Sequence, residues 1–196
     1  MFSLSFISRS NKIKTQSEGF GLIELLVSIS IMVVVTSVVL VRQTSFNGAV
    51  LLRSQAYEVA LQLRDAQLNA VSATGQSGNY RSLIGVHFDT TNNGTYRIFR
   101  DVDGDSYYDV NEEFGLQGQI DPRFEVRAIR ADGNSVTNLS VVYERPNFDA
   151  RFFDGANSEV TAATVEIDIA RVGADGTGLG DIRTVEVTSA GQVAVQ

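Results

Sequence analysis

The chain has 196 residues and a formal charge of −7, which favours one domain, or a small domain with an appendage. It has no cysteine and one histidine. Disulfides, thiolate zinc sites and clusters of histidine ligands are therefore excluded. Because phosphate contacts dominate nucleic-acid affinity, a chain this acidic is poorly suited to bind nucleic acid over a broad face.

The most apolar segment runs from Phe20 to Val41, and its only charged residue is Glu24. As a helix it would be about 33 Å long, enough to cross a bilayer. Three basic residues precede it, namely Arg9, Lys12 and Lys14. By the positive-inside rule we expect the N-terminus in the cytoplasm, a transmembrane helix over 20–42, and a periplasmic or extracellular domain over 43–196. The run does not end in a small-x-small cleavage site, which argues against a secretory signal peptide.

Glu24 does not fit a plain membrane anchor, because a carboxylate inside a membrane span costs roughly 2.5–3.5 kcal/mol. The surrounding segment, EGFGLIELLV over 18–27, resembles the prepilin signature of type IV pilins and of type II secretion pseudopilins. The resemblance implies that a prepilin peptidase removes the basic leader 1–19 by cutting between Gly19 and Phe20, and then methylates the new N-terminal Phe20. Gly21 departs from the pattern, in which Thr or Ser is commoner. The remaining alternative is an unprocessed anchor.

Cleavage would remove three basic residues and one acid, and would change the formal charge from −7 to −9. It would also create a positive amine at Phe20. In a filament, Glu24 of one subunit can face this amine on a neighbour, so that neither charge is left unpaired in an apolar core. We therefore interpret Glu24 as an assembly residue.

An amphipathic helix is predicted to follow the apolar run. Small and apolar residues recur at alternating spacings of four and three along one face, namely Leu52, Ala56, Val59, Leu63, Ala66, Ala70 and Ala73. No proline interrupts 20–74, and Gly75 is a natural stop. The pattern favours a helix that packs on a sheet of its own domain over a coiled coil.

Beyond Gly75 the pattern changes to short strands and turns. Strands are predicted over 83–88, 96–100, 124–129, 139–143, 164–171, 182–188 and 192–195, with a hairpin turn at 92–94. A helical half followed by an all-strand half predicts an α+β fold, in which the long N-terminal helix packs on an antiparallel β-sheet.

Three later segments resemble the GspH/FimT-like minor pseudopilins and minor pilins. They are LQLRDAQ over 61–67, FRDVDGD over 99–105, and RTVEV over 183–187 with Gly191. The resemblance implies a pilin-like fold and a non-enzymatic, structural role in a type IV pilus or a type II secretion pseudopilus. It also implies prepilin peptidase, an inner-membrane assembly platform and other pilin or pseudopilin subunits as partners. A pilus-displayed protein that binds DNA or a surface is the alternative.

One polar segment, DVDGDSYYDVNE over 101–112, has the spacing of a calcium-binding loop. Carboxylates stand at positions 1, 3, 5, 9 and 12, and a backbone carbonyl would serve at position 7. The candidate ligands are Asp101, Asp103, Asp105, Tyr107, Asp109 and Glu112. Ser106 stands where such loops have a glycine. Possible calcium binding and a solvated acidic turn are both left open.

The remaining polar residues do not form a catalytic arrangement. His87 lies in a predicted strand without a nucleophile beside it, so we interpret it as structural. Five arginines could form a basic stripe for DNA, namely Arg123, Arg127, Arg130, Arg145 and Arg151. Interleaved acids and the negative net charge argue against that stripe.

Overall fold

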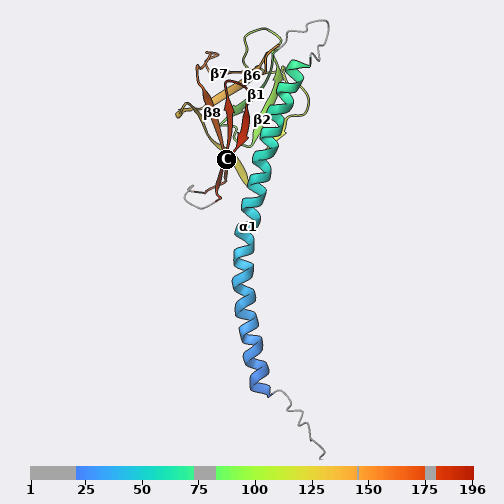
Figure 1. Cartoon of the computed structure of the whole chain (residues 1–196), viewed down its shortest axis with the longest axis vertical. Coiled ribbons are helices and arrows are strands. Elements are labelled where there is room, and N and C mark those ends of the chain that lie inside the picture. Colours follow the sequence, from blue (N-terminus) through green and yellow to red (C-terminus); the bar gives the residue numbers. More distant parts are fainter. Residues whose placement is uncertain (1–20, 73–82, 145, 175–179) are drawn as a thin grey trace, which may run out of the picture. The chain divides into compact units, whose positions relative to one another are not determined.

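The structure is a computed model that describes residues 21–72, 83–144, 146–174 and 180–196, without the side chains of 41–46. The chain forms two compact units, Met1–Thr44 and Ser45–Gln196. Within the described residues there is one helix, α1 (Leu22–Val71), which contributes to both units (Figure 1).

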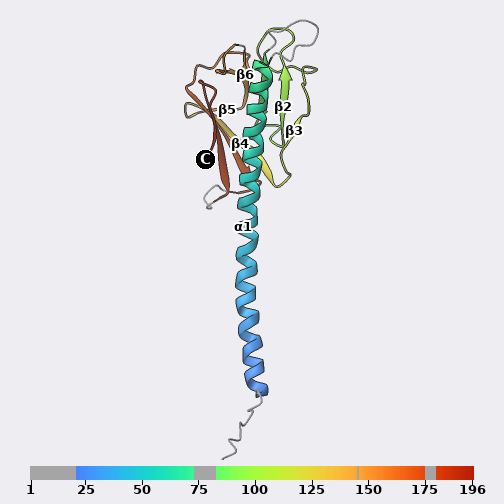
Figure 2. The same ribbon diagram turned by 45° about the vertical axis from the view of Figure 1, so that its right-hand side comes forward.

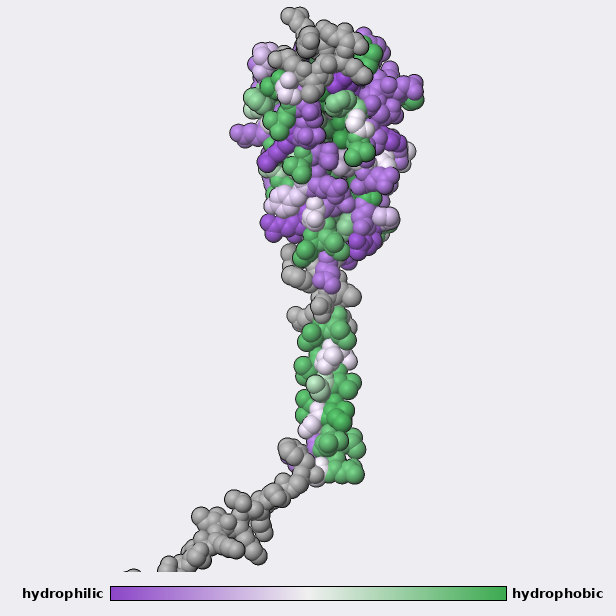
Figure 3. All heavy atoms as spheres, turned by 90° about the vertical axis from the view of Figure 1, so that its right-hand side faces the viewer, coloured by the Kyte–Doolittle hydropathy of each residue, from purple (hydrophilic) through white to green (hydrophobic). Residues whose placement is uncertain are grey.

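In the first unit, α1 is apolar, and the hydroxyl groups of its apolar segment are hydrogen-bonded within the helix. Residues Leu22–Leu40 are long and apolar enough to cross a membrane, and their surface is almost uniformly hydrophobic in Figure 3. Each hydroxyl in this segment donates a hydrogen bond to the carbonyl four residues earlier, from Ser28, Ser30, Thr36 and Ser37. Such internal bonds are what a helix needs in a solvent that offers no hydrogen-bond partners.

The second unit contains two five-stranded antiparallel sheets. Sheet A has the order β3-β2-β1-β6-β7, and sheet B has the order β10-β9-β8-β4-β5. The strands of sheet A are β1 (Ile84–Asp89), β2 (Thr95–Arg100), β3 (Gly118–Gln119), β6 (Asn138–Tyr143) and β7 (Ala150–Asp154). Those of sheet B are β4 (Phe124–Ala131), β5 (Asn134–Val136), β8 (Thr164–Arg171), β9 (Ile182–Thr188) and β10 (Val193–Val195).

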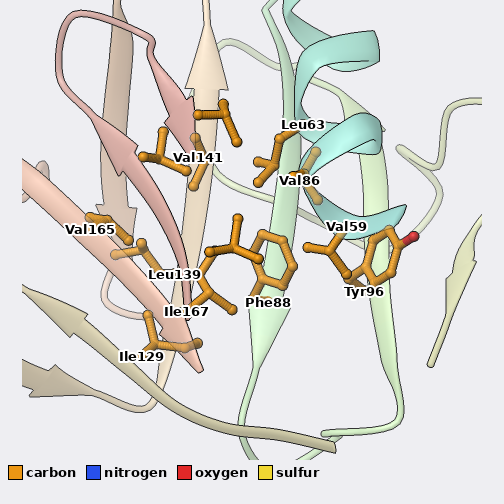
Figure 4. Close-up of a cluster of buried hydrophobic side chains, with 14 of the residues drawn as sticks. Val59, Leu63, Val86, Phe88, Tyr96, Ile129, Leu139, Val141, Val165 and Ile167 are labelled. Atoms are coloured by element: carbon orange, nitrogen blue, oxygen red, sulfur yellow. The ribbon is translucent and has the colours of Figure 1, made fainter. Parts of the chain in front are cut away.

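A single core joins the second half of α1 to both sheets. In Figure 2 this part of α1 crosses between β2 and β3 on one side and β4 and β5 on the other. Val59 and Leu63 are fully buried on the helix. They lie in one cluster with Val86 and Phe88 of sheet A and with Ile167 of sheet B (Figure 4). The period of the helix and the alternation of the strands therefore direct three apolar faces to one place.

Two side chains of α1 fasten the C-terminal strand to the helix. The Arg64 guanidinium donates to the Val193 carbonyl at 2.7 Å. The Gln67 amide donates to the carbonyls of Phe148 at 2.6 Å and of Gly191 at 3.0 Å. The bond from Arg64 satisfies a carbonyl of β10, the edge strand of sheet B, that would otherwise be open to pairing with another chain.

The structure confirms the α+β fold, with a helix on antiparallel strands. The predicted buried stripe on α1 is confirmed from Leu52 to Ala70, whereas its last predicted member, Ala73, lies outside the described residues. The turn at 92–94 joins β1 to β2. The strands belong to two sheets rather than one, and the short strands β3, β5 and β7 were not predicted. The helix stop at Gly75 lies outside the described residues.

Candidate functional site

The acidic segment 101–112 forms a loop directly after β2 that is closed by its own carboxylates. The Asp101 side chain is almost fully buried. Its Oδ1 accepts the Gly104 N–H at 2.6 Å and its Oδ2 accepts the Ser106 N–H at 3.0 Å. At the other end of the loop, buried Glu112 accepts the N–H groups of Val102 at 2.7 Å and of Asp109 at 3.2 Å. Two carboxylates thus hold four backbone amides.

Ser106 adopts the conformation that a glycine would provide at this position. Its φ is +69°, in the left-handed region that few non-glycine residues enter. The hydrogen bond from its N–H to Asp101 supports this turn. The serine therefore does not prevent the turn expected at position 6 of a calcium-binding loop.

Two tyrosines of the acidic loop pack on the outer face of sheet A around His87. The Tyr108 ring stacks on the imidazole with centroids 5.2 Å apart, and the Tyr107 ring meets it edge-on at 5.2 Å. The imidazole Nδ1 lies 3.0 Å from the Ser140 hydroxyl, and burial lowers the pKa of His87 to about 4. His87 is thus a buried, hydrogen-bonded structural residue.

A second, smaller apolar cluster lies under the loop. It consists of Leu83, Phe99, Val142 and Phe153, with Tyr107 and Tyr108 against it. Gly85 makes this packing possible, since a Cβ there would lie 2.6 Å from the Phe99 ring. The acidic loop is therefore anchored by aromatic packing as well as by its amide bonds.

Burial raises the pKa of Asp101 and the pKa of Glu112 above their ordinary values. The folded loop therefore binds these protons more tightly than the unfolded chain does. Through this effect the free energy of unfolding falls as the pH rises from the unfolded pKa through the folded pKa. A cation held among the carboxylates would relieve the same penalty at neutral pH.

The structure brings together only part of the predicted calcium ligand set. Asp101, Asp103 and Asp105 each offer one carboxylate oxygen, and these oxygens lie within 4.8 Å of one another. Asp109 and Glu112 do not belong to this group. Glu112 already uses both oxygens for backbone amides, and the Tyr107 carbonyl stays a prediction. The calcium site stays a prediction, with three carboxylates as its centre.

Calcium should raise the melting temperature of the full chain in detergent, and Asp103→Asn should weaken the response. A Kd of about 1 mM, typical of weak extracellular sites, would add about 1.4 kcal/mol at about 10 mM Ca²⁺. Mg²⁺ should act weakly because it demands stricter octahedral geometry. Asp109→Asn removes the same charge outside the group and should retain the response. If added Ca²⁺ leaves the melting curve of the unmodified chain unchanged, the segment 101–112 binds no calcium and is only an acidic turn.

The predicted assembly residue lies at the start of α1, whereas the predicted cleavage site lies outside the described residues. Glu24 is exposed in the first turn of the helix. No ion pair within the described part of the chain involves it. Gly19 and Phe20 precede the first described residue, so the junction between them is known from the sequence alone.

The arginines proposed for a DNA-binding stripe are dispersed and largely neutralised. Arg123, Arg127 and Arg130 belong to β4 or the residue before it, whereas Arg151 lies on β7 of the other sheet. Arg130 contacts Glu166 and Asp168, Arg151 contacts Glu159 and Glu144, and Arg123 contacts Asp121. Arg145 lies outside the described residues. These residues do not form one continuous basic stripe.

Comparison with known protein families identifies one match. Residues 14–40 match the prokaryotic N-terminal methylation motif, which includes the predicted junction Gly19–Phe20 and the residue Glu24. This match, followed by an apolar helix and an α+β domain, supports a type IV pilin-like protein that is processed as a prepilin. Members carrying this motif are structural subunits, and the motif with its apolar helix fits a membrane-anchored pilin. No curated protein and no solved structure matches the chain significantly.

Proposed function

We propose that this chain is a structural subunit of a type IV pilus or a type II secretion pseudopilus. In this view it waits in the cytoplasmic membrane and enters the filament through its N-terminal helix. The observation that carries the proposal is the methylation motif at 14–40, fused without interruption to an apolar helix that has a single carboxylate near its start.

The second half of α1 offers a surface suited to subunit packing. Val50, Tyr57, Leu61 and Leu68 are about half exposed or more. Their spacings of seven and four place them on one side of the helix, opposite the stripe buried in the core. We call these four residues the outer stripe. An apolar face that remains exposed in the monomer supports a further contact in an assembly.

Contacts within the domain support the narrower proposal of a GspH/FimT-like minor subunit. Arg64 and Gln67 belong to the resembling segment 61–67, and both reach the C-terminal region that carries the last resembling segment. Arg64 binds the Val193 carbonyl, and Gln67 binds the Gly191 carbonyl. The segment 61–67 and the C-terminal region, which each resemble this group, are thus in contact.

Processing should occur between Gly19 and Phe20. When the full chain is produced with an active prepilin peptidase, intact-mass spectrometry should find a methylated N-terminal Phe20. Gly19→Val should leave the precursor uncut, because a branched side chain blocks the close approach of the protease to the backbone. Gly21→Ser, which restores the commoner residue, should be processed normally. A membrane protein that keeps Met1 despite active peptidase would contradict the proposal.

A further inference from the structure

One end of sheet B carries arginines where the strand pattern calls for apolar residues. Along β8, Val165, Ile167 and Ile169 are fully buried in the core, and the next residue in the same alternation is Arg171. Along β9, Val187 and Val185 are fully buried, and the alternation continues to Arg183. Ile169 and Arg183 are register partners in the two strands. The core face of sheet B therefore ends in two neighbouring arginines.

These arginines lie beside the point where α1 enters the second unit. A Cβ on Gly48 would lie 2.0 Å from a terminal nitrogen of Arg171, so the guanidinium rests against the helix at this glycine. A Cβ on Gly180, just before β9, would lie 3.1 Å from the Cβ of Ala49. The absence of a side chain at Gly48 thus allows a cation to sit at this end of the domain.

A third arginine lies on β4, where Arg127 follows Val126, the register partner of Ile169. Arg127 is exposed and donates a hydrogen bond to the Ala174 carbonyl, in the chain that follows β8. Within the described residues, Arg127, Arg171 and Arg183 form no ion pair, unlike Arg123, Arg130 and Arg151. We call Arg127, Arg171 and Arg183 the basic end. Val172, directly after Arg171, exposes 52% of its surface.

The basic end is close to the membrane span along the chain. Gly48 follows the last residue of the apolar segment, Leu40, by eight positions. Eight residues reach about 12 Å as a helix and at most about 28 Å when fully extended. Whatever the geometry between the two units, an anchored chain holds Gly48 within that distance of the bilayer. An exposed apolar side chain beside arginines that form no ion pair with another described residue suits the headgroup layer.

We propose that the basic end docks on anionic phospholipid headgroups while the subunit waits in the membrane. The inference rests on the membrane anchoring of the proposed function. The chain as a whole carries −7, so an anionic surface repels most of it and attracts the arginines of the basic end. Docking therefore orients the domain before assembly, and the contact is released when the subunit leaves the bilayer.

The absence of cysteine in the chain allows a direct test with one reporter. Val172→Cys, labelled with an environment-sensitive dye, is reconstituted as the full chain into phosphatidylcholine bilayers with and without phosphatidylglycerol. A nitroxide-labelled lipid should quench the dye only when phosphatidylglycerol is present, and about 0.5 M salt should abolish the effect by screening. Val110→Cys, in the acidic loop and 76% exposed, is the control reporter and should stay unquenched.

Charge variants distinguish docking by the arginines from mere closeness to the bilayer through the membrane helix. Arg171→Gln with Arg183→Gln should lower the docked-to-free ratio by about fivefold for each arginine. Arg97→Gln with Arg151→Gln removes the same charge from sheet A and should leave it unchanged. Melting curves verify that each variant is folded. The salt and lipid dependence of the reporter with its arginines intact provides a test that needs no charge variant.

Three results would overturn the inference. They are equal quenching in neutral bilayers, no quenching in anionic ones, and salt-sensitive binding of a DNA duplex by the basic end without lipid docking. Flotation of the chain with the bilayers reports anchoring separately. A chain that fails to float contradicts the proposed function, whereas one that floats without docking contradicts only this inference.

Discussion

Replacing Glu24 with valine should leave the chain in the membrane and remove it from filaments. Insertion should improve, because the variant loses a penalty of roughly 2.5–3.5 kcal/mol for a carboxylate in the span. Assembly should fail, because the amine at Phe20 of a neighbouring subunit would be buried without its partner. Breaking one side of a buried ion pair costs about 3–5 kcal/mol, so incorporation should fall more than tenfold. The measurement is the amount of subunit in sheared filaments relative to the membrane pool.

Two further substitutions separate charge from shape at this position. Glu24→Gln keeps the size of the side chain and should fail as Glu24→Val does, whereas Glu24→Asp keeps the charge and should restore part of the incorporation. Normal assembly of Glu24→Val would remove the argument for charge pairing and leave the apolar helix and the outer stripe as the proposed assembly determinants.

Replacing Leu63 with alanine should destabilise the domain by about 2–5 kcal/mol. Leu63 of α1 is fully buried in the core that α1 forms with both sheets. The shorter side chain therefore leaves a cavity that the surrounding strands cannot fill. Denaturant unfolding of the full chain in detergent, followed by the circular dichroism of the sheets, measures this loss.

Leu61 provides the matched control on the same helix. It is 64% exposed and belongs to the outer stripe, so Leu61→Ala should change the free energy of unfolding by no more than about 0.5 kcal/mol. The same variant should reduce incorporation into filaments if the outer stripe contacts another subunit. Equal stability losses for Leu61→Ala and Leu63→Ala would mean that the helix is oriented differently in the domain.

The sequence predicted those elements in which a single physical signal dominates. The alternation of Val165, Ile167 and Ile169 correctly marks β8, and the stripe from Leu52 to Ala70 correctly marks the core face of α1. The division into two sheets could not be predicted, because local alternation does not say which strands are neighbours. β3 and β5 are too short to carry a period, and Phe152 and Phe153 in β7 are adjacent apolar residues that bury opposite faces in different clusters.

The site was predicted unevenly for a related reason. The prepilin signature lies within one contiguous stretch, so its spacing can be read directly. The contact of Tyr107 and Tyr108 with His87 joins segments that are distant in the chain, and no local pattern indicates it. Ser106 stands where such loops have a glycine, but its left-handed backbone is supported by Asp101, which lies five residues earlier.

The bonds from α1 to the C-terminal strand have a consequence for how the domain acquires its structure. Arg64 and its partner Val193 are 129 residues apart, and Gln67 and Gly191 are 124 residues apart. If the domain is exported as proposed, the amphipathic half of the helix reaches the far side of the membrane before the strand that completes its surroundings. Loop closure over such separations is slow compared with local helix formation. Export in that order leaves the buried stripe of α1 exposed until the C-terminal strand has crossed.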